Sequence, residues 1–144
     1  MLKRKVYQEL LKWKENTEGK ALCIIGARQI GKTTLIREFG KNEYEHFAEI
    51  NFVTDEKAAD IFNDKLTAEA IITNLTAYLQ TPLEPGKTLI LFDEVQECPA
   101  VRSAIKFLVE DGRFDYIESG SLLGVRYKDC LLYTSPSPRD KRQS

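Results

Sequence analysis

The most constraining feature of the sequence is an eight-residue stretch that matches G-x-x-x-x-G-K-[ST], the Walker A phosphate-binding pattern. It consists of Gly26, Ala27, Arg28, Gln29, Ile30, Gly31, Lys32 and Thr33. Glycines let the backbone turn tightly around an anion, so that successive N–H groups point at phosphate oxygens. Lys32 adds a mobile positive charge, and Thr33 offers a hydroxyl to Mg²⁺. The pattern therefore predicts a ligand that carries phosphates and is bound together with Mg²⁺.

The residues on either side of this stretch make the match more specific. Residues 21–25 form a short apolar run that predicts a buried strand, and residues 33–39 predict a helix that Gly40 ends. The N-terminus of such a helix directs its positive dipole end at the phosphates. A chance match in an unrelated loop is the alternative, and the order of strand, loop and helix makes it the weaker reading.

Length and composition limit the class of protein. The chain has 144 residues, of which 42% are hydrophobic and 30% charged, as in one ordinary soluble globular domain. Its formal net charge of −1 gives no general basic field, so nucleic-acid binding is not indicated. We see no membrane-spanning run and no signal-peptide pattern, and we therefore expect a cytoplasmic protein. Besides the phosphate-bearing ligand, the partners we consider are a second copy of the chain and another protein.

Periodicity predicts the remaining elements. An amphipathic lead-in helix is expected over residues 1–15, and the alternation over 46–53 predicts a strand with one exposed face, which suits a sheet edge. A second helix is expected over 66–79, with Thr67 as a plausible N-cap. A third helix over 99–111, ended by Gly112, leads to a strand over 113–118.

A second chemical pattern lies at residues 87–94, where four consecutive apolar residues precede Asp93 and Glu94. The apolar run requires a fully buried central strand. At its end, Asp93 can hold Mg²⁺ directly or through water, and Glu94 is placed to polarise a water for attack on a γ-phosphate. This is the Walker B pattern, and the adjacent glutamate favours hydrolysis. Two exposed acids after a strand are the alternative explanation.

Two serines follow the strand expected over 113–118. Ser119 and Ser121 are both candidates for a small polar group that touches the γ-phosphate or the attacking water, the role called sensor 1. That role requires this strand to lie between the strands that carry the Walker A and Walker B patterns. A turn that simply ends the strand explains the two serines almost equally well.

Taken together, residues 26–35, 92–99 and 119–124 resemble the prokaryotic AAA-type ATP-binding proteins that carry a second, C-terminal domain. The resemblance extends over about residues 1–128 and includes the lead-in helix. It implies an α/β fold of the additional-strand P-loop class, a three-layer sandwich in which the strand before Ser119 is inserted between the other two. It also implies ATP and Mg²⁺ as ligands. The phosphate contacts would come from residues 26–33 and Thr34, the metal contact from Asp93 and the water contact from Glu94.

The end of the sequence departs from this family. We expect an incomplete AAA-like core over residues 1–129, truncated before the fifth strand and the lid, and a disordered, non-native tail over 130–144. A genuine Ser-Pro-rich docking or phosphorylation segment is the alternative. Without a fifth strand, the strand over 21–25 would lie at a sheet edge and stability would fall. An arginine finger is expected to be missing, with Arg102 and Arg113 in ordinary surface roles.

The leading functional hypothesis is a P-loop ATPase domain that converts ATP and water to ADP and phosphate, with weak activity in this chain. A nucleotide-dependent switch or interaction module that binds ATP without turnover is the second. A small-molecule kinase is the third, and the pair Asp93 and Glu94 counts against it because it favours water as the acceptor. The absence of a guanine-reading N-K-x-D pattern mildly favours ATP over GTP.

Overall fold

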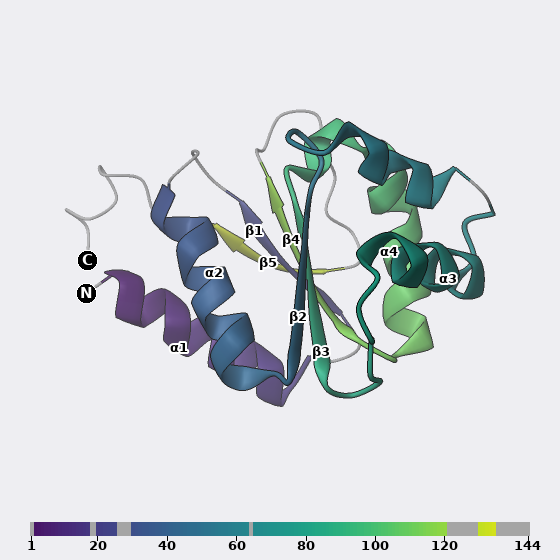
Figure 1. Ribbon diagram of the computed structural model, residues 1–144. Coiled ribbons are helices and arrows are strands. Elements are labelled where there is room, and N and C mark those ends of the chain that lie inside the picture. The colour runs from purple at the N-terminus through teal and green to yellow at the C-terminus, as the bar shows by residue number, and fades with distance from the viewer. Residues whose placement is uncertain (1, 18–19, 26–29, 64, 121–129, 135–144) are drawn as a thin grey trace.

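The fold is built on a five-stranded parallel sheet with the strand order β2-β3-β4-β1-β5 (Figure 1). The computed structural model describes residues 2–17, 20–25, 30–63, 65–120 and 130–134. The strands are β1 (Ala21–Ile25), β2 (His46–Asn51), β3 (Thr88–Asp93), β4 (Asp115–Gly120) and β5 (Cys130–Thr134). Four of these five strands overlap the runs that the sequence predicts, although β2 ends two residues earlier than expected and β4 is shifted by two residues, so that it includes Ser119.

The strand order confirms the additional-strand arrangement. β4 lies between β1 and β3, with Ile117 paired to Leu22 on one side and to Leu91 on the other. Every residue of β3 is buried, as the continuous apolar run requires of a central strand. β2 lies at one edge of the sheet and alternates between partly exposed and buried residues, as its sequence predicts.

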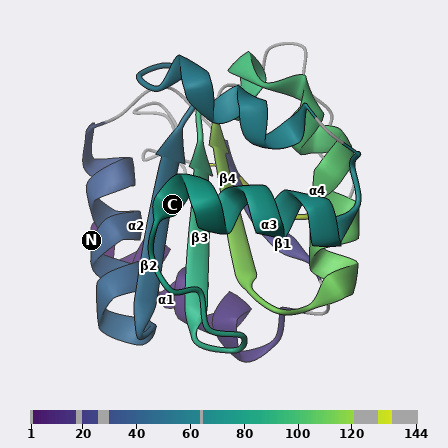
Figure 2. The same ribbon diagram turned by 45° about the vertical axis from the view of Figure 1, so that its right-hand side comes forward.

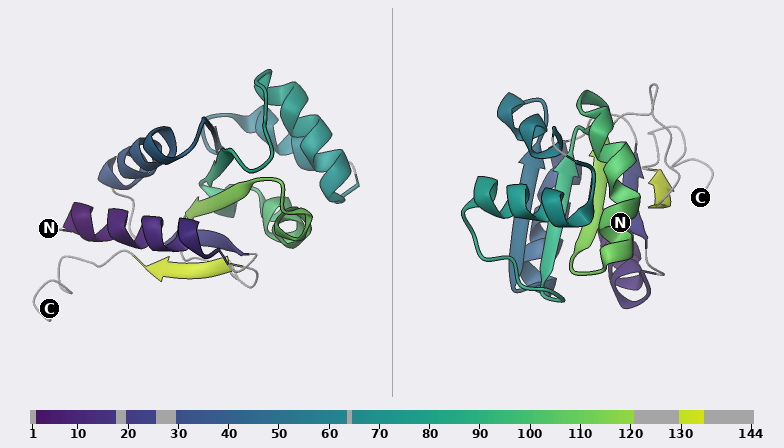
Figure 3. Two further views of the ribbon diagram at one scale, coloured as in Figure 1. Left: turned by 90° about the horizontal axis from the view of Figure 1, so that it is seen from below. Right: turned by 90° about the vertical axis from the view of Figure 1, so that its right-hand side faces the viewer.

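The fifth strand corrects our expectation for the end of the sheet. Residues 130–134, which we assigned to a disordered tail, form β5 and pair in parallel with the whole of β1 (Figure 3). β1 is therefore flanked by β4 and β5 and is not an edge strand. The physical reason is that this short apolar run can pair beside the buried strand β1, whereas we judged it by the polar residues that follow. Residues 135–144, the rest of the expected tail, lie outside the described residues.

Helices cover both faces of the sheet and give the three layers that the resemblance implies (Figures 1 and 2). α1 (Leu2–Glu15) and α2 (Ile30–Glu43) lie on one face, and α3 (Ala68–Leu79) and α4 (Pro99–Asp111) lie on the other. Two short 3₁₀ helices, η1 (Glu56–Phe62) and η2 (Val95–Glu97), follow β2 and β3. None of the helices in the described residues is long and apolar enough to cross a bilayer.

Each face of the sheet has its own apolar core. The core under α1 and α2 includes the buried side chains of Leu10, Trp13 and Phe39, and the lead-in helix is fixed there because the Trp13 indole donates to the Lys20 carbonyl at 3.1 Å. The larger core under α3 and α4 contains stacked and tilted aromatic rings from both strands and helices. Burial of these side chains is the main force that holds the layers together.

Two helix ends agree with the signals in the sequence, whereas α2 does not end at Gly40 as we expected. It continues to Glu43, and Gly40 instead lets the helix pack closely against the Phe47 ring, which a Cβ atom at this position would meet. The Thr67 hydroxyl caps α3 by accepting a hydrogen bond from the Ala70 N–H at 3.2 Å, as expected of an N-cap. Gly112 ends α4 with φ of 78°, a left-handed conformation that glycine adopts without strain. Both predicted caps are therefore confirmed: Thr67 marks the start of α3, and Gly112 marks the end of α4.

Candidate functional site

A row of polar side chains lies at the carboxyl ends of three neighbouring strands. The register pairs Asn51 with Asp93 and Asp93 with Ser119, and Ser119 is also paired with Ile24. Partners in a parallel register point to the same face of the sheet. Ile24 packs in the core under α1 and α2, so the three polar side chains face α2, the helix that follows the Walker A pattern.

Thr33 reaches this row from the first turn of α2. Its hydroxyl Oγ1 donates to Asp93 Oδ2 at 3.5 Å, although the two residues are 60 positions apart in the sequence. Asp93 is only 7% exposed, and Thr33 is partly exposed. The structure thus brings together the two residues for which the sequence predicts a shared metal ion.

The Asp93 carboxylate is held from two further directions. Asn51 Nδ2 donates to Asp93 Oδ2 at 3.4 Å, and the Glu94 backbone N–H donates to Asp93 Oδ1 at 2.9 Å. Asn51 is itself fixed, because its Oδ1 accepts from the backbone N–H groups of Val53 at 2.8 Å and Thr54 at 3.1 Å. Sequence reasoning missed Asn51, and the available signal was an amide side chain at the carboxyl end of a predicted strand.

Glu94 has an unusual backbone conformation. Its φ of 58° and ψ of 47° lie in the left-handed region, which few residues other than glycine adopt. Its carboxylate Oε1 accepts a hydrogen bond from Gln96 Nε2 at 2.9 Å. A sharp turn therefore follows β3 directly and sets the direction of the side chain predicted to polarise water.

Ser119 is buried at the end of β4 with 1% of its surface exposed. Its hydroxyl Oγ has no hydrogen-bond partner among the described residues. A buried hydroxyl without a partner is costly, so such a group at the end of a strand favours a role in contacting a ligand. Ser121, the second sensor candidate, lies outside the described residues.

The phosphate-binding stretch is described only in part. Gly26, Ala27, Arg28 and Gln29 lie outside the described residues. Residues 30–32, which include Gly31 and Lys32, form the start of α2, and their side chains are not described. Thr34 follows them on α2 and is exposed. The backbone position of α2 is consistent with the predicted strand, loop and helix order.

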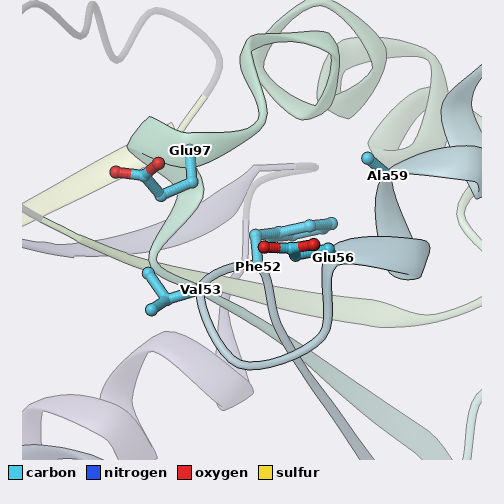
Figure 4. Close-up of a pocket in the computed structure, with 5 residues that line it drawn as sticks. All are labelled: Phe52, Val53, Glu56, Ala59 and Glu97. Atoms are coloured by element: carbon cyan, nitrogen blue, oxygen red, sulfur yellow. The ribbon is translucent and has the colours of Figure 1, made fainter.

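A hollow of about 430 Å³ lies beside this row (Figure 4). It is lined by Phe52 and Val53 after β2, by Glu56 and Ala59 of η1, and by Glu97 of η2. None of the lining residues takes part in the contact between Thr33 and Asp93. The hollow is therefore separate from the candidate site.

The two arginines weighed as arginine fingers differ from each other. Arg102 is not a surface residue, because its side chain is 12% exposed and its guanidinium Nη1 contacts both carboxylate oxygens of Glu118, which is fully buried. Our expectation failed because the partner lies on β4, where a charge in the middle of a buried strand needs a counter-ion. Arg113 is 35% exposed and pairs with Glu69 and Asp111, in the surface role that we expected.

The fold, together with the position of Asn51, Asp93 and Ser119 at the carboxyl ends of its strands, defines a class of protein. A parallel sheet with β4 inserted between β1 and β3, covered by helices on both faces, is the α/β architecture of AAA-like P-loop domains. The sequence model of a family described as an AAA domain matches residues 18–132, which is most of the chain. The chain therefore belongs to this AAA domain family. Members of this class are nucleotide-binding, ATPase-like domains. Among curated proteins, none matches the chain.

Two solved structures share the fold. PCH-2 from C. elegans superposes with a TM-score of 0.59 at 15% sequence identity, over 96% of this chain and 44% of that chain. Drosophila ORC, solved bound to AT-rich DNA and Cdc6, gives a TM-score of 0.52 at 9% identity, over 96% and 57% of the respective chains. The present chain thus spans about half the length of these neighbours, and the likeness concerns the fold alone.

Proposed function

We propose that this chain binds MgATP at the carboxyl edge of its sheet and hydrolyses it with the help of Glu94. The observation that carries the proposal is the contact between the Thr33 hydroxyl and the Asp93 carboxylate. It joins the last residue of the Walker A pattern to the first acid of the Walker B pattern, which chance matches to two separate motifs would not do.

The donor set suits Mg²⁺. This ion prefers oxygen ligands and is usually held by one or two carboxylates together with phosphate oxygens and water. Thr33 and Asp93 supply one hydroxyl and one carboxylate within 3.5 Å of each other. They would hold the ion, which when bound neutralises charge on the β- and γ-phosphates. Lys32 and the backbone N–H groups of residues 26–33 would bind the phosphate oxygens.

Glu94 and Ser119 have separate tasks in this proposal. Glu94 accepts a proton from the attacking water, or orients it, as a general base. Ser119 offers its hydroxyl Oγ, which has no hydrogen-bond partner among the described residues, to the γ-phosphate or to that water. A hydrogen bond from bound nucleotide or water would satisfy this buried hydroxyl, and this favours a sensing role.

Calorimetry of MgATP binding to the purified chain tests the first half of the proposal. Wild-type protein should bind saturably, and Lys32→Ala should not, because the variant removes the positive charge at the phosphates while leaving the sheet intact. Lys57→Ala serves as the matched control, since Lys57 is exposed on η1. Absence of binding to a folded wild-type sample would contradict the proposal.

Phosphate release on the same samples tests the second half. Glu94→Gln should bind MgATP as wild type does and release no phosphate, because the amide cannot act as a base. Binding without any release by the wild-type chain would contradict hydrolysis and support the nucleotide-dependent switch. Phosphate release without any added acceptor would separate an ATPase from a small-molecule kinase.

A further inference from the structure

The side chain of Gln96 links the Glu94 carboxylate to the end of β4. Gln96 lies in η2, two residues after Glu94, and its Nε2 donates to Glu94 Oε1 at 2.9 Å. The left-handed backbone of Glu94 is followed directly by the 3₁₀ helix η2, and this local geometry lets the amide reach the carboxylate two residues back in the chain. A carboxylate held in this way loses much of its rotational freedom.

The other end of the same amide lies against Gly120, the last residue of β4. A Cβ atom built on Gly120 would lie 2.5 Å from Gln96 Oε1 and 3.3 Å from the Val95 backbone nitrogen. Only glycine therefore leaves room for the amide in its present position. Gly120 directly follows Ser119, so the strand that carries the buried hydroxyl also determines where the amide can lie.

We propose that Gln96 is a positioning residue for the hydrolytic reaction, which holds the Glu94 carboxylate through its amide and ties it to the end of β4 through close contact with Gly120. The inference rests on the proposed function. Gln96 itself needs no contact with the nucleotide, so its loss should impair the chemical step and leave binding intact.

Kinetics of phosphate release test the positioning role. Gln96→Leu replaces the amide by an apolar side chain of similar bulk and so removes the donor, and it should lower kcat by about 10- to 100-fold with KM for MgATP unchanged. Gly120→Ala should act in the same direction, since its Cβ displaces the amide. Gln8→Leu, which changes an exposed glutamine of α1, is the matched control.

Nuclear magnetic resonance of ¹⁵N-labelled protein without nucleotide tests the link independently of ATP hydrolysis. The Gln96 side-chain amide signal, assigned by its loss in Gln96→Leu, should shift in both Glu94→Ala and Gly120→Ala. It should stay in place in Glu110→Ala, a change at an exposed glutamate of α4. An unchanged chemical shift of this signal in Glu94→Ala would overturn the inference, and so would a wild-type kcat in Gln96→Leu. Neither result would contradict the proposed ATPase function. A wild-type chain that binds MgATP and releases no phosphate would instead contradict the proposed function and, with it, the catalytic role of Gln96.

Discussion

The Thr33 hydroxyl and the Asp93 carboxylate lie 3.5 Å apart across the boundary between α2 and the sheet. The contact joins the first turn of the helix to the end of the central strand, so the two oxygens that we propose as metal ligands already lie together. Preorganised ligands of this kind reduce the ordering cost that binding would otherwise carry.

Replacing Thr33 by valine tests this relationship. Thr33→Val keeps the branched shape and removes the hydroxyl, and we expect MgATP affinity to fall by about 10- to 100-fold, as for loss of one bond to a charged group. Thr33→Ser, which keeps the oxygen, should bind nearly as well as wild type. Thr73→Val on α3, whose hydroxyl bonds only the preceding helical turn, is the control for the loss of a threonine hydroxyl. Equal affinities of Thr33→Val and wild type, measured by calorimetry, would exclude a metal contact by Thr33.

Asn51 gives a second test, because it holds Asp93 without being a metal ligand in the proposal. Asn51→Asp keeps an acceptor for the Val53 and Thr54 N–H groups and places a second negative charge beside Asp93. We expect a lower midpoint of thermal unfolding without Mg²⁺ and partial recovery when MgCl₂ is added. Asn63→Asp, beside Asp60 on the exposed surface, should change little in either condition. A midpoint unaffected by Asn51→Asp would show that the amide does not organise the site.

The sequence predicted most of the sheet because the relevant signals are local. The apolar run before Asp93 predicted a buried strand. The alternation of apolar and polar residues before Asn51 predicted a strand with one solvent-exposed face. The secondary structure of the four apolar residues before Thr134 was ambiguous, because so short a run forms a strand only where a neighbouring strand can pair with it. Pairing with β1, which is about 110 residues away in the chain, decided that case.

The site was predicted less completely because several of its contacts depend on register and backbone geometry. Asp93, Glu94 and Thr33 belong to patterns that can be recognised in any sequence. Asn51 acquires its role only from the register of β2 against β3, and Gln96 acquires its role from the left-handed turn at Glu94. Neither the register nor the turn has a distinct signal in a single sequence.

The buried pair of Arg102 and Glu118 makes a prediction about stability. Arg102→Met should lower the free energy of unfolding by about 3–5 kcal/mol, because it leaves the fully buried Glu118 carboxylate without its counter-ion. Arg37→Met is the matched control, since Arg37 also forms two bonds to one carboxylate, that of Glu49, but its side chain is half exposed. That change should cost about 1 kcal/mol or less.

Urea denaturation of both variants provides the measurement. A double variant, Arg102→Met with Glu118→Leu, should recover much of the loss, because it removes the unpaired charge and leaves an apolar pair. If Arg102→Met and Arg37→Met cost the same, burial of the first pair would have no energetic consequence. The comparison therefore tests the location of Arg102 as well as the strength of its contact.

The partly buried Tyr44 and the buried Tyr116 differ in a way that can be measured. The Tyr44 hydroxyl donates to Asp115 at 2.7 Å, whereas the Tyr116 hydroxyl has no hydrogen-bond partner among the described residues. Tyr44→Phe should therefore destabilise the protein by about 1–2 kcal/mol. Tyr116→Phe should be neutral or stabilising by about 1 kcal/mol, because it removes a buried unpaired hydroxyl and keeps the ring stacked on Phe92. The opposite order in urea denaturation would mean that the Tyr116 hydroxyl has a partner in solution.

The same two tyrosines predict how stability changes in alkali. Burial, together with the hydrogen bond to Asp115, raises the pKa of Tyr44, and burial together with the nearby charge of Asp111 raises the pKa of Tyr116. A tyrosine in the unfolded chain ionises near pH 10, whereas these two stay neutral in the fold well above that value. Their contribution to stability is therefore complete below about pH 10 and is lost as the pH rises further, by about 1 kcal/mol for each tyrosine at pH 11. Urea denaturation at pH 8 and pH 11 should show a smaller loss for the double variant Tyr44→Phe with Tyr116→Phe than for wild type. Because both proteins keep the same lysines, equal losses would mean that neither tyrosine resists ionisation in the fold.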